Sequence, residues 1–216
     1  MPYRRTENVV RRLAAREQTI LTAALSLAGE GGMQAVQIAA VAKHANIAAG
    51  TVYRYFPSKN DLIGELIAAV SGREMAAMRR AADAAPGPLS ALAASIATFA
   101  GRALAERKLA WAALAEPVDA EIDTMRLDFR QSVAAEIETR IHAARTRQLL
   151  PEQDARAVAP AIVGAVVEGL IGPLAPEPAD AAASREAVQE MTLMALRALG
   201  VMDARARGLV AQVPLP

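Results

Sequence analysis

The chain has 216 residues, of which 53% are hydrophobic and only 3% aromatic, so a core must be built largely from Ala, Leu, Val, Ile and Met, which favours helices. It contains no cysteine, which excludes disulfides, thiolate metal sites and a cysteine nucleophile. The net charge of +1 conceals an uneven distribution, because residues 1–60 carry eight Lys and Arg against three acids. This basic segment suits a polyanionic partner, although charge alone fits a solvated N-terminal arm equally well.

The length accommodates one large domain, or a small domain attached to a larger one. The first 16 residues are rich in arginine and no apolar segment follows them, and no window of about 18 to 20 uncharged apolar residues suggests a membrane span. We therefore expect a cytoplasmic protein that does not enter a membrane.

Three short helical patterns occupy the first sixty residues. Apolar residues recur at helical spacing over residues 11–28, and this pattern stops at the glycine-rich residues 29–32. A second pattern over residues 37–44 is separated from a third, over residues 51–55, by Asn46, which tolerates the left-handed conformation. Two short helices joined by a tight turn indicate a helix-turn-helix.

The residues around Pro57 mark the next helix boundary. Pro57 disfavours helical geometry at Phe56, and Ser58 followed three residues later by Asp61 approximates a capping box. A helix is therefore predicted from Ser58 to about Ala82, where it would couple the N-terminal segment to the rest of the chain.

The remaining chain reads as helices separated by proline-containing segments, over residues 89–107, 109–115, 120–149, 155–174 and 184–199. No strand-like alternation is visible, so the predicted architecture is all-α, with about nine helices. We divide it into a three-helix head with a basic arm (residues 1–60), a helical bundle (residues 61–200) and a loosely ordered C-terminal tail (residues 201–216).

The most specific motif is the run Gly50-Thr51-Val52-Tyr53-Arg54-Tyr55-Phe56-Pro57-Ser58-Lys59, preceded by Ile20-Leu21-Thr22-Ala23-Ala24 and Val41-Ala42-Lys43-His44-Ala45-Asn46-Ile47. Residues 20–66 thereby resemble the N-terminal domain of TetR/AcrR regulators, whose signature is G-T-[LV]-Y-x-[HY]-F-x-[SN]-K. The resemblance implies a dimeric, sequence-specific transcriptional regulator, commonly a repressor that a small molecule releases from its DNA operator.

In a helix-turn-helix the N-terminal residues of the second helix meet base edges in the major groove. The hydroxyls of Tyr53 and Tyr55 can each donate to a phosphate, although Tyr53 could instead be a packed wedge between helices. Val52 and Phe56 are expected to be core residues, beside Val41. The predicted DNA-contacting residues are Gln37, Lys43, Ala49, Gly50, Thr51, Tyr53, Tyr55 and Lys59.

Two features of the head bear on how DNA would be read. Gln37 stands where the family commonly has a threonine that caps the second helix and touches phosphate, and its amide can do the same less locally. Alanines at 39, 48 and 49 stand where relatives often carry polar side chains, so base readout should be sparse and DNA shape more important. The arginines Arg4, Arg5, Arg11 and Arg12 form either an arm along the DNA backbone or minor groove, or a solvated arm.

The late helices carry the candidate dimer surface. Specific operator binding by a small head generally requires two half-sites, hence a two-fold dimer. The predicted interface residues are Ile162, Val166, Leu170, Met191 and Met194, and the alternative is that they form an ordinary monomer core. The family resemblance implies a four-helix bundle between two chains at these helices.

The middle helices hold large flexible side chains that suit an adaptable apolar pocket for a hydrophobic or acyl-type effector. The predicted ligand-binding residues are Met75, Met78, Phe99, Trp111, Leu114, Met125, Arg126, Phe129 and Arg130, with the two arginines anchoring an anionic end. The alternatives are that the apolar residues are core, that Arg126 pairs with Asp123 or Glu121, and that Arg130 pairs with Asp128 or Glu136.

The sequence offers little for an enzyme. It has only two histidines, His44 and His142, and neither a glycine-rich phosphate loop nor a paired-carboxylate motif, so we expect no catalytic activity, no metal and no cofactor. The alternative to a DNA-binding regulator is a helical protein-interaction module without DNA activity.

Overall fold

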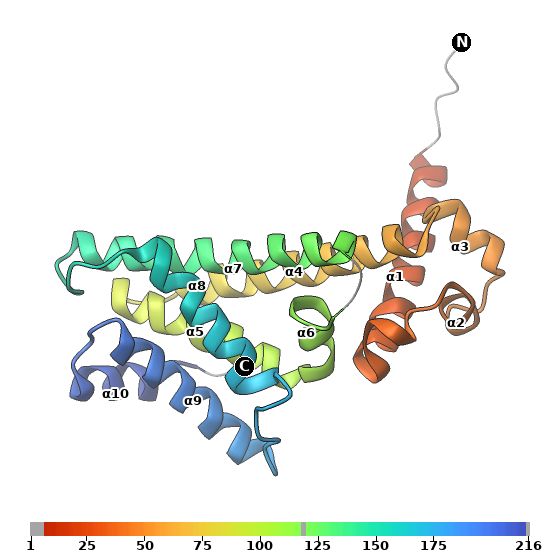
Figure 1. Ribbon diagram of the computed structural model, residues 1–216. Helices are drawn as coiled ribbons and strands as arrows, with labels where there is room; N and C mark the ends of the chain where they lie inside the picture. The colour runs from red at the N-terminus through yellow and green to blue at the C-terminus, as the bar shows by residue number, and fades with distance from the viewer. Residues whose placement is uncertain (1–6, 118–119, 215–216) are drawn as a thin grey trace.

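A computed structural model describes residues 7–117 and 120–214, and within them the chain is built from ten α-helices and one π-helical segment, without strands (Figure 1). The elements in chain order are α1 (Glu7–Ala35), α2 (Ile38–His44), α3 (Ala49–Tyr55), α4 (Lys59–Asp83), α5 (Pro88–Ala105), α6 (Arg107–Leu114), α7 (Ala120–Thr146), α8 (Ala155–Val166), the π-helix η1 (Val167–Ile171), α9 (Ala181–Ala198) and α10 (Asp203–Gln212). The predicted all-α fold is confirmed.

Helices α1 to α3 form a head at one end of the molecule (Figure 1). The first helix breaks inside the predicted glycine-rich segment, since Gly31 leaves the helical region and Gly32 adopts φ 71° and ψ −171°, a conformation essentially confined to glycine. The head core forms as expected, because Val41 and Val52 are completely buried and Phe56 is 3% exposed.

The predicted capping box at the start of α4 is confirmed. The Ser58 hydroxyl accepts a hydrogen bond from the Asp61 amide at 3.0 Å, and the Asp61 carboxylate accepts one from the Ser58 amide at 2.9 Å. These bonds satisfy two backbone donors that a helix N-terminus otherwise leaves without a partner. They fix the point at which α4 leaves the head.

Replacing Ser58 by alanine is expected to lower the free energy of unfolding by about 1 kcal/mol, because the Asp61 amide loses its acceptor. Urea-induced unfolding followed by circular dichroism measures this change. The matched control is Ser132→Ala. Ser132 is exposed on α7 and its hydroxyl only donates to the Asp128 carbonyl one turn earlier, so the change in stability should stay within about 0.5 kcal/mol. Equal effects for the two variants would contradict a stabilising cap.

Helix α5 is the centre of the body. Its length and mean hydropathy of 1.2 would also suit a membrane span, but two thirds of this helix (67%) is buried inside the molecule. It packs against α4, α7 and α9, and α4 and α7 lie side by side along the body (Figure 1). Helix α5 is therefore the core helix of the bundle.

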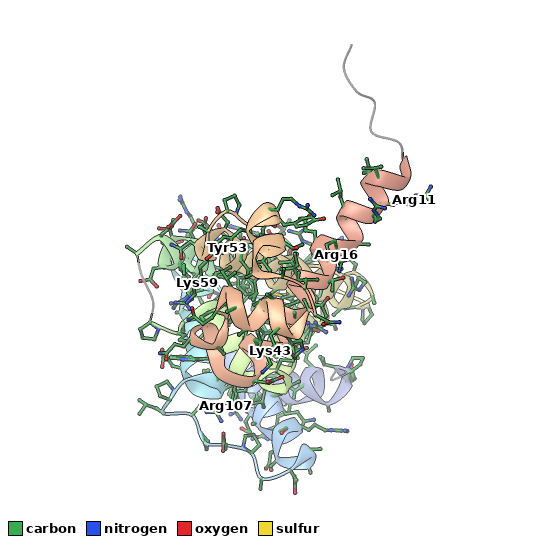
Figure 2. The ribbon with its side chains drawn as sticks, turned by 90° about the vertical axis from the view of Figure 1, so that its right-hand side faces the viewer. Arg11, Arg16, Lys43, Tyr53, Lys59 and Arg107 are labelled. Atoms are coloured by element: carbon green, nitrogen blue, oxygen red, sulfur yellow. The ribbon has the colours of Figure 1, made fainter. Side chains whose placement is uncertain are left out.

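Helix α6 connects the body to the head. The Glu116 carboxylate, just after α6, accepts a hydrogen bond from the Met33 amide at 2.8 Å, and the Lys108 ammonium donates to the Glu30 carbonyl at 3.3 Å. At its other side, the Arg107 guanidinium (Figure 2) donates to four carbonyls of residues 171–176, at the last residue of η1 and in the segment after it. Helix α6 thus ties the end of α1 to the late helices.

The expectation of a loose C-terminal tail is wrong for residues 203–212, which form α10. Its Ala206 and Val210, one turn apart, are buried against the body, and Asp203 near its start accepts hydrogen bonds from Arg197 and Arg207. The hydrogen bonds to these two arginines lower the pKa of the exposed Asp203 carboxyl. The helix also brings the total within the described residues above the nine expected.

Candidate nucleic-acid interface and internal cavity

The turn between α2 and α3 has the geometry of a helix-turn-helix. Asn46 adopts the predicted left-handed conformation, with φ 53°, and the Ile47 amide donates to the Ala42 carbonyl at 2.9 Å. The turn sets α3 across α2, with Val52 facing inward. The opposite side of α3 lies at the surface of the head (Figure 1).

The N-terminal end of α3 is accessible. Ala49 and Gly50 are exposed, Thr51 is partly exposed, and a Cβ added at Gly50 would meet no atom within 4 Å. Another surface can therefore approach the backbone of this turn closely. This is the end of the helix that meets base edges in a helix-turn-helix.

The two tyrosines of α3 occupy different environments. Tyr53 is 52% exposed, which excludes the packed-wedge alternative and leaves its phenol at the surface. Tyr55 is partly buried against the core, and the Arg54 guanidinium lies 5.7 Å from its ring centroid. Of the two hydroxyls, that of Tyr53 is better placed to donate to a phosphate.

Basic side chains surround α3 on the same face of the head. Lys43 is exposed in the last turn of α2, and Lys59 is partly exposed at the first residue of α4; Figure 2 shows both on the face that carries Tyr53. Gln37 is exposed at the N-cap of α2, but its amide donates to the Gln34 carbonyl at 3.0 Å, so the expected side-chain cap is absent there.

The predicted basic arm is partly helical. Arg11 and Arg12 are exposed in the first turns of α1, which project beyond the rest of the head, whereas Arg4 and Arg5 lie outside the described residues (Figure 2). Arg16, which is not among the predicted arm residues, is also exposed on this projecting part. Its spacing of four residues from Arg12 was the available signal, because such residues share one face of a helix.

A small internal cavity of about 10 Å³ lies between α4, α5, α6 and α7, enough for a single water molecule. Three of the nine predicted ligand-binding residues line it, namely Phe99, Leu114 and Phe129. Met75 and Met78 are buried in the core, Trp111 packs partly buried against it, and Met125 lies in a separate groove between α4 and α7.

Arg126 is 3% exposed and holds the C-terminal end of α6. Its guanidinium donates twice to the Ala112 carbonyl, at 3.0 and 2.7 Å, and also to the Glu116 carbonyl. It forms one of the two ion pairs considered from the sequence, with Asp123 at 3.4 Å. An effector anion would have to compete with these carbonyls, and whether Arg126 anchors an effector stays a prediction.

Arg130 lies one turn further along α7 and is partly exposed. Its suggested partner Glu136 is instead bound by Arg79 of α4 and Arg140 of α7, at 3.2 and 2.6 Å. The Arg79–Glu136 pair joins α4 to α7 away from the cavity, whereas the Arg140–Glu136 pair lies within α7. The role of Arg130 as an anchor also stays a prediction.

Sequence reasoning missed an ionic cluster at the edge of the cavity, formed by Arg73 and Glu74 of α4 with Arg102 and Glu106 at the end of α5. Arg102 donates to both oxygens of Glu74, at 2.6 and 2.9 Å, while Arg73 donates to Glu74 at 3.0 Å and to Glu106 at 2.8 Å. The hydrogen bond to Glu74 raises the pKa of Arg102 further above its ordinary value. The available signal was that Arg102 is the sole charged residue within the otherwise apolar α5.

The helices expected at a dimer interface turn part of their apolar surface inward. Ile162, Val166 and Leu170 are at most 5% exposed within one chain, whereas Met191 is partly exposed and Met194 is 40% exposed. A partner chain could reach Met194 directly, but the first three side chains are already covered by their own chain. The monomer-core alternative therefore describes those three residues, and dimerisation stays a prediction.

Comparison with known proteins identifies the family that the N-terminal domain resembles. The family model described as "Bacterial regulatory proteins, tetR family" matches residues 20–66, which include α2, α3 and the start of α4. The transcriptional repressor KstR of Rhodococcus jostii is 53% identical over 53 residues, which are 24% of this chain and 25% of that protein. The matched segment thus spans about a quarter of this relative.

Solved structures extend the likeness to the body. RolR in complex with resorcinol aligns with a TM-score of 0.68 at 18% identity, covering 96% of this chain and 98% of RolR. FadR of Bacillus subtilis in complex with stearoyl-CoA aligns with a TM-score of 0.69 at 19% identity, covering 81% of this chain and 97% of FadR. At these identities the likeness establishes the fold. Residues 20–66 therefore match the N-terminal domain of the tetR family of bacterial regulatory proteins, and the whole chain shares the fold of these solved structures.

Proposed function

We propose that the chain is a cytoplasmic, homodimeric transcriptional repressor that binds operator DNA through α3 and leaves it when a small apolar effector binds the body. The observation that carries the proposal is the exposed N-terminal end of α3, which lies within the segment that matches the family domain. Double-stranded DNA is a polyanion, and the basic head would attract it electrostatically. The curated relatives that match this head are themselves repressors.

Each group of the head has a role in this proposal. Ala49, Gly50 and Thr51 meet base edges, and Tyr53 and Lys59 donate to phosphates on the DNA backbone. Lys43 and Arg16 add positive charge on the same face (Figure 2). The side chains of Ala48, Ala49 and Gly50 offer no hydrogen-bond donors to the bases, so DNA shape contributes to site selection.

The homodimer follows from the size of the head, because one short recognition helix makes few contacts and two related half-sites supply the rest. The proposed interface uses the outward faces of α8 and α9. On α8 these faces carry small residues such as Ala161, Gly164 and Ala165, which allow close helix approach, and on α9 they carry Met191 and Met194. The buried Ile162, Val166 and Leu170 support this surface from inside.

The effector is proposed to act through α4. This helix begins at the Ser58 cap beside α3 and contributes Val70 and Glu74 to the cavity wall, so a ligand that opens the cavity displaces the helix that positions the head. The contacts of Glu116 and Lys108 with the end of α1 provide a second connection. RolR and FadR were each solved with a small molecule, resorcinol and stearoyl-CoA respectively, which supports an effector-responsive body.

We propose no enzymatic activity, consistent with membership of a family of regulators. The alternative of a helical interaction module without DNA activity draws no specific support from the structure. The two are separated by selecting bound DNA from a random pool with the purified full chain. We expect an enriched site with two inverted half-sites, and the absence of any enriched sequence would contradict the proposal.

Replacing Gly50 by alanine is expected to separate folding from DNA binding. The added Cβ meets no atom within 4 Å, so the free energy of unfolding should rise by up to about 1 kcal/mol, as expected for alanine in place of a helical glycine. Affinity for the selected DNA should fall at least about tenfold, because the methyl group separates the backbone from the base edges.

The matched control is Gly208→Ala on α10, where an added Cβ also meets no atom within 4 Å. It should gain similar stability without any change in DNA affinity. Chemical denaturation and fluorescence anisotropy with labelled DNA measure the two quantities. Unchanged affinity of the Gly50 variant would remove this turn from the interface.

A further inference from the structure

We infer that the inner face of α5 is a binding site for an elongated amphipathic carboxylate, with Arg102 receiving the carboxylate and the buried hydroxyl of Ser95 receiving a second polar group. The inference rests on the proposed function, since it names the chemical class of the effector and the residues that recognise it. It leaves unchanged the proposed DNA binding by the head and the proposed role of α4 in positioning the head.

Ser95 provides the first observation. Its side chain is completely buried, and among the described residues its Oγ is the buried side-chain oxygen or nitrogen that lacks a hydrogen-bond partner. Buried hydroxyls in folded proteins nearly always have a partner, because burying an unsatisfied polar group opposes folding. A polar atom of a bound molecule would satisfy this hydroxyl.

The spacing along α5 provides the second observation. Ser95, Phe99 and Arg102 follow the pattern i, i+4, i+7, so they share one face of the helix. At 1.5 Å per residue, Ser95 and Arg102 lie about 10 Å apart along the helix axis. Phe99 lies between them and lines the cavity with Leu114 and Phe129. This face therefore presents a polar group, an apolar stretch and a cation in succession.

The contacts of the ionic cluster allow Arg102 to pair with an anion. Glu74 is bound by two arginines, so an effector carboxylate that takes Arg102 leaves Glu74 paired with Arg73. An effector cation would instead compete with both guanidinium groups for Glu74. Guanidinium also matches a carboxylate in a two-pronged geometry, which Glu74 occupies in this structure.

Binding at this face requires the cavity to open, because its 10 Å³ admits only a water molecule. The effector must displace Phe99 and Phe129 and exchange the Glu74–Arg102 link for its own contact with Arg102. That link joins α4 to α5, so its loss frees α4 at the point where it passes the cavity. Pairing of the effector carboxylate with Arg102 therefore also breaks the link between α4 and α5.

The test uses isothermal titration calorimetry on the full chain with four probes, octanoate, ω-hydroxyoctanoate, octan-1-ol and octylammonium. An eight-carbon chain spans about the distance between Ser95 and Arg102. Octanoate should bind at least about tenfold more tightly than octan-1-ol or octylammonium, since only the carboxylate can pair with Arg102. Equal or tighter binding of the alcohol or the amine would overturn the inference.

Three substitutions sharpen the result. Glu74→Gln should raise octanoate affinity about tenfold, because a neutral amide competes less for Arg102, while Arg102→Gln should lower it at least about tenfold. Ser95→Ala should weaken ω-hydroxyoctanoate about tenfold and leave octanoate unchanged, since only the hydroxylated probe loses a partner. A merely structural role for the cluster would make Glu74→Gln neutral or harmful to binding, which would overturn the inference.

The matched control is Arg79→Gln, which removes an α4–α7 ion pair away from the cavity and should leave all four affinities unchanged. Should Arg102→Gln fail to fold, Glu74→Gln and Ser95→Ala still decide. Because calorimetry needs no DNA, octanoate binding without an enriched DNA site would sink only the proposed function. An enriched site without octanoate binding would sink only this inference.

Discussion

The double substitution Tyr53→Phe and Lys59→Ala removes two donors from each of the two chains and should weaken binding of the dimer to the selected operator about ten-thousandfold while the protein remains folded. Each change removes one donor to a phosphate, worth roughly 1.5 kcal/mol for a hydrogen bond to a charged group. Tyr53 is 52% exposed and Lys59 partly exposed, so neither change disturbs the core. Fluorescence anisotropy at several salt concentrations is the measurement.

The salt dependence of the affinity shows whether Lys59 pairs with a phosphate. Removing one ionic phosphate contact from each of two chains should reduce the slope of log affinity against log salt by about two. The matched control, Arg205→Ala, removes an exposed charge from α10, away from the head, and should change neither affinity nor slope appreciably. An unchanged affinity for the double variant would favour the interaction-module alternative.

Replacing the buried Arg126 by leucine is expected to reduce the free energy of unfolding by about 3 kcal/mol. The guanidinium satisfies the carbonyls of Ala112 and Glu116 at the end of α6, and leucine would leave these acceptors buried without it. Since Glu116 also accepts the Met33 amide, the contact between head and body should loosen as well. Urea-induced unfolding measures the decrease in stability.

Arg130→Leu is the matched control, because it changes the same residue type one turn away on the same helix. Arg130 is partly exposed, so its replacement should alter stability by no more than about 0.5 kcal/mol. If the two variants are equally destabilised, Arg126 does not hold α6 as described. Retained stability with weakened effector binding would instead support the prediction that Arg126 is an anion anchor.

Residue type alone does not show which arginine lies at the cavity. Arg126 and Arg130 of α7 look equivalent in the sequence, four residues apart on one face of the helix. In the fold one is committed to backbone carbonyls and the other is partly exposed, while Arg102 of α5 lies at the cavity. Which arginine reaches a cavity depends on helix packing, and no local pattern encodes that.

The sequence by itself determined the head. A left-handed turn at Asn46, a capping box at Ser58 and the buried positions Val52 and Phe56 all depend on interactions within a few residues, so composition and spacing were sufficient. The segment that resembles the tetR family also lies entirely within this local structure. The helices of the body other than α10 were predicted for the same reason, with ends that differ by a few residues.

Only the tertiary structure decided which helix faces of the body are buried and which neighbours cover them. Ile162 and Val166 proved to face their own core, the supposed tail proved to be the packed helix α10, and Ser95 proved to be a buried hydroxyl without a partner among the described residues. An amphipathic helix encodes which face is apolar, but not which neighbour covers it. That choice depends on packing between segments far apart in the chain, where burial and pairing of side chains are settled together.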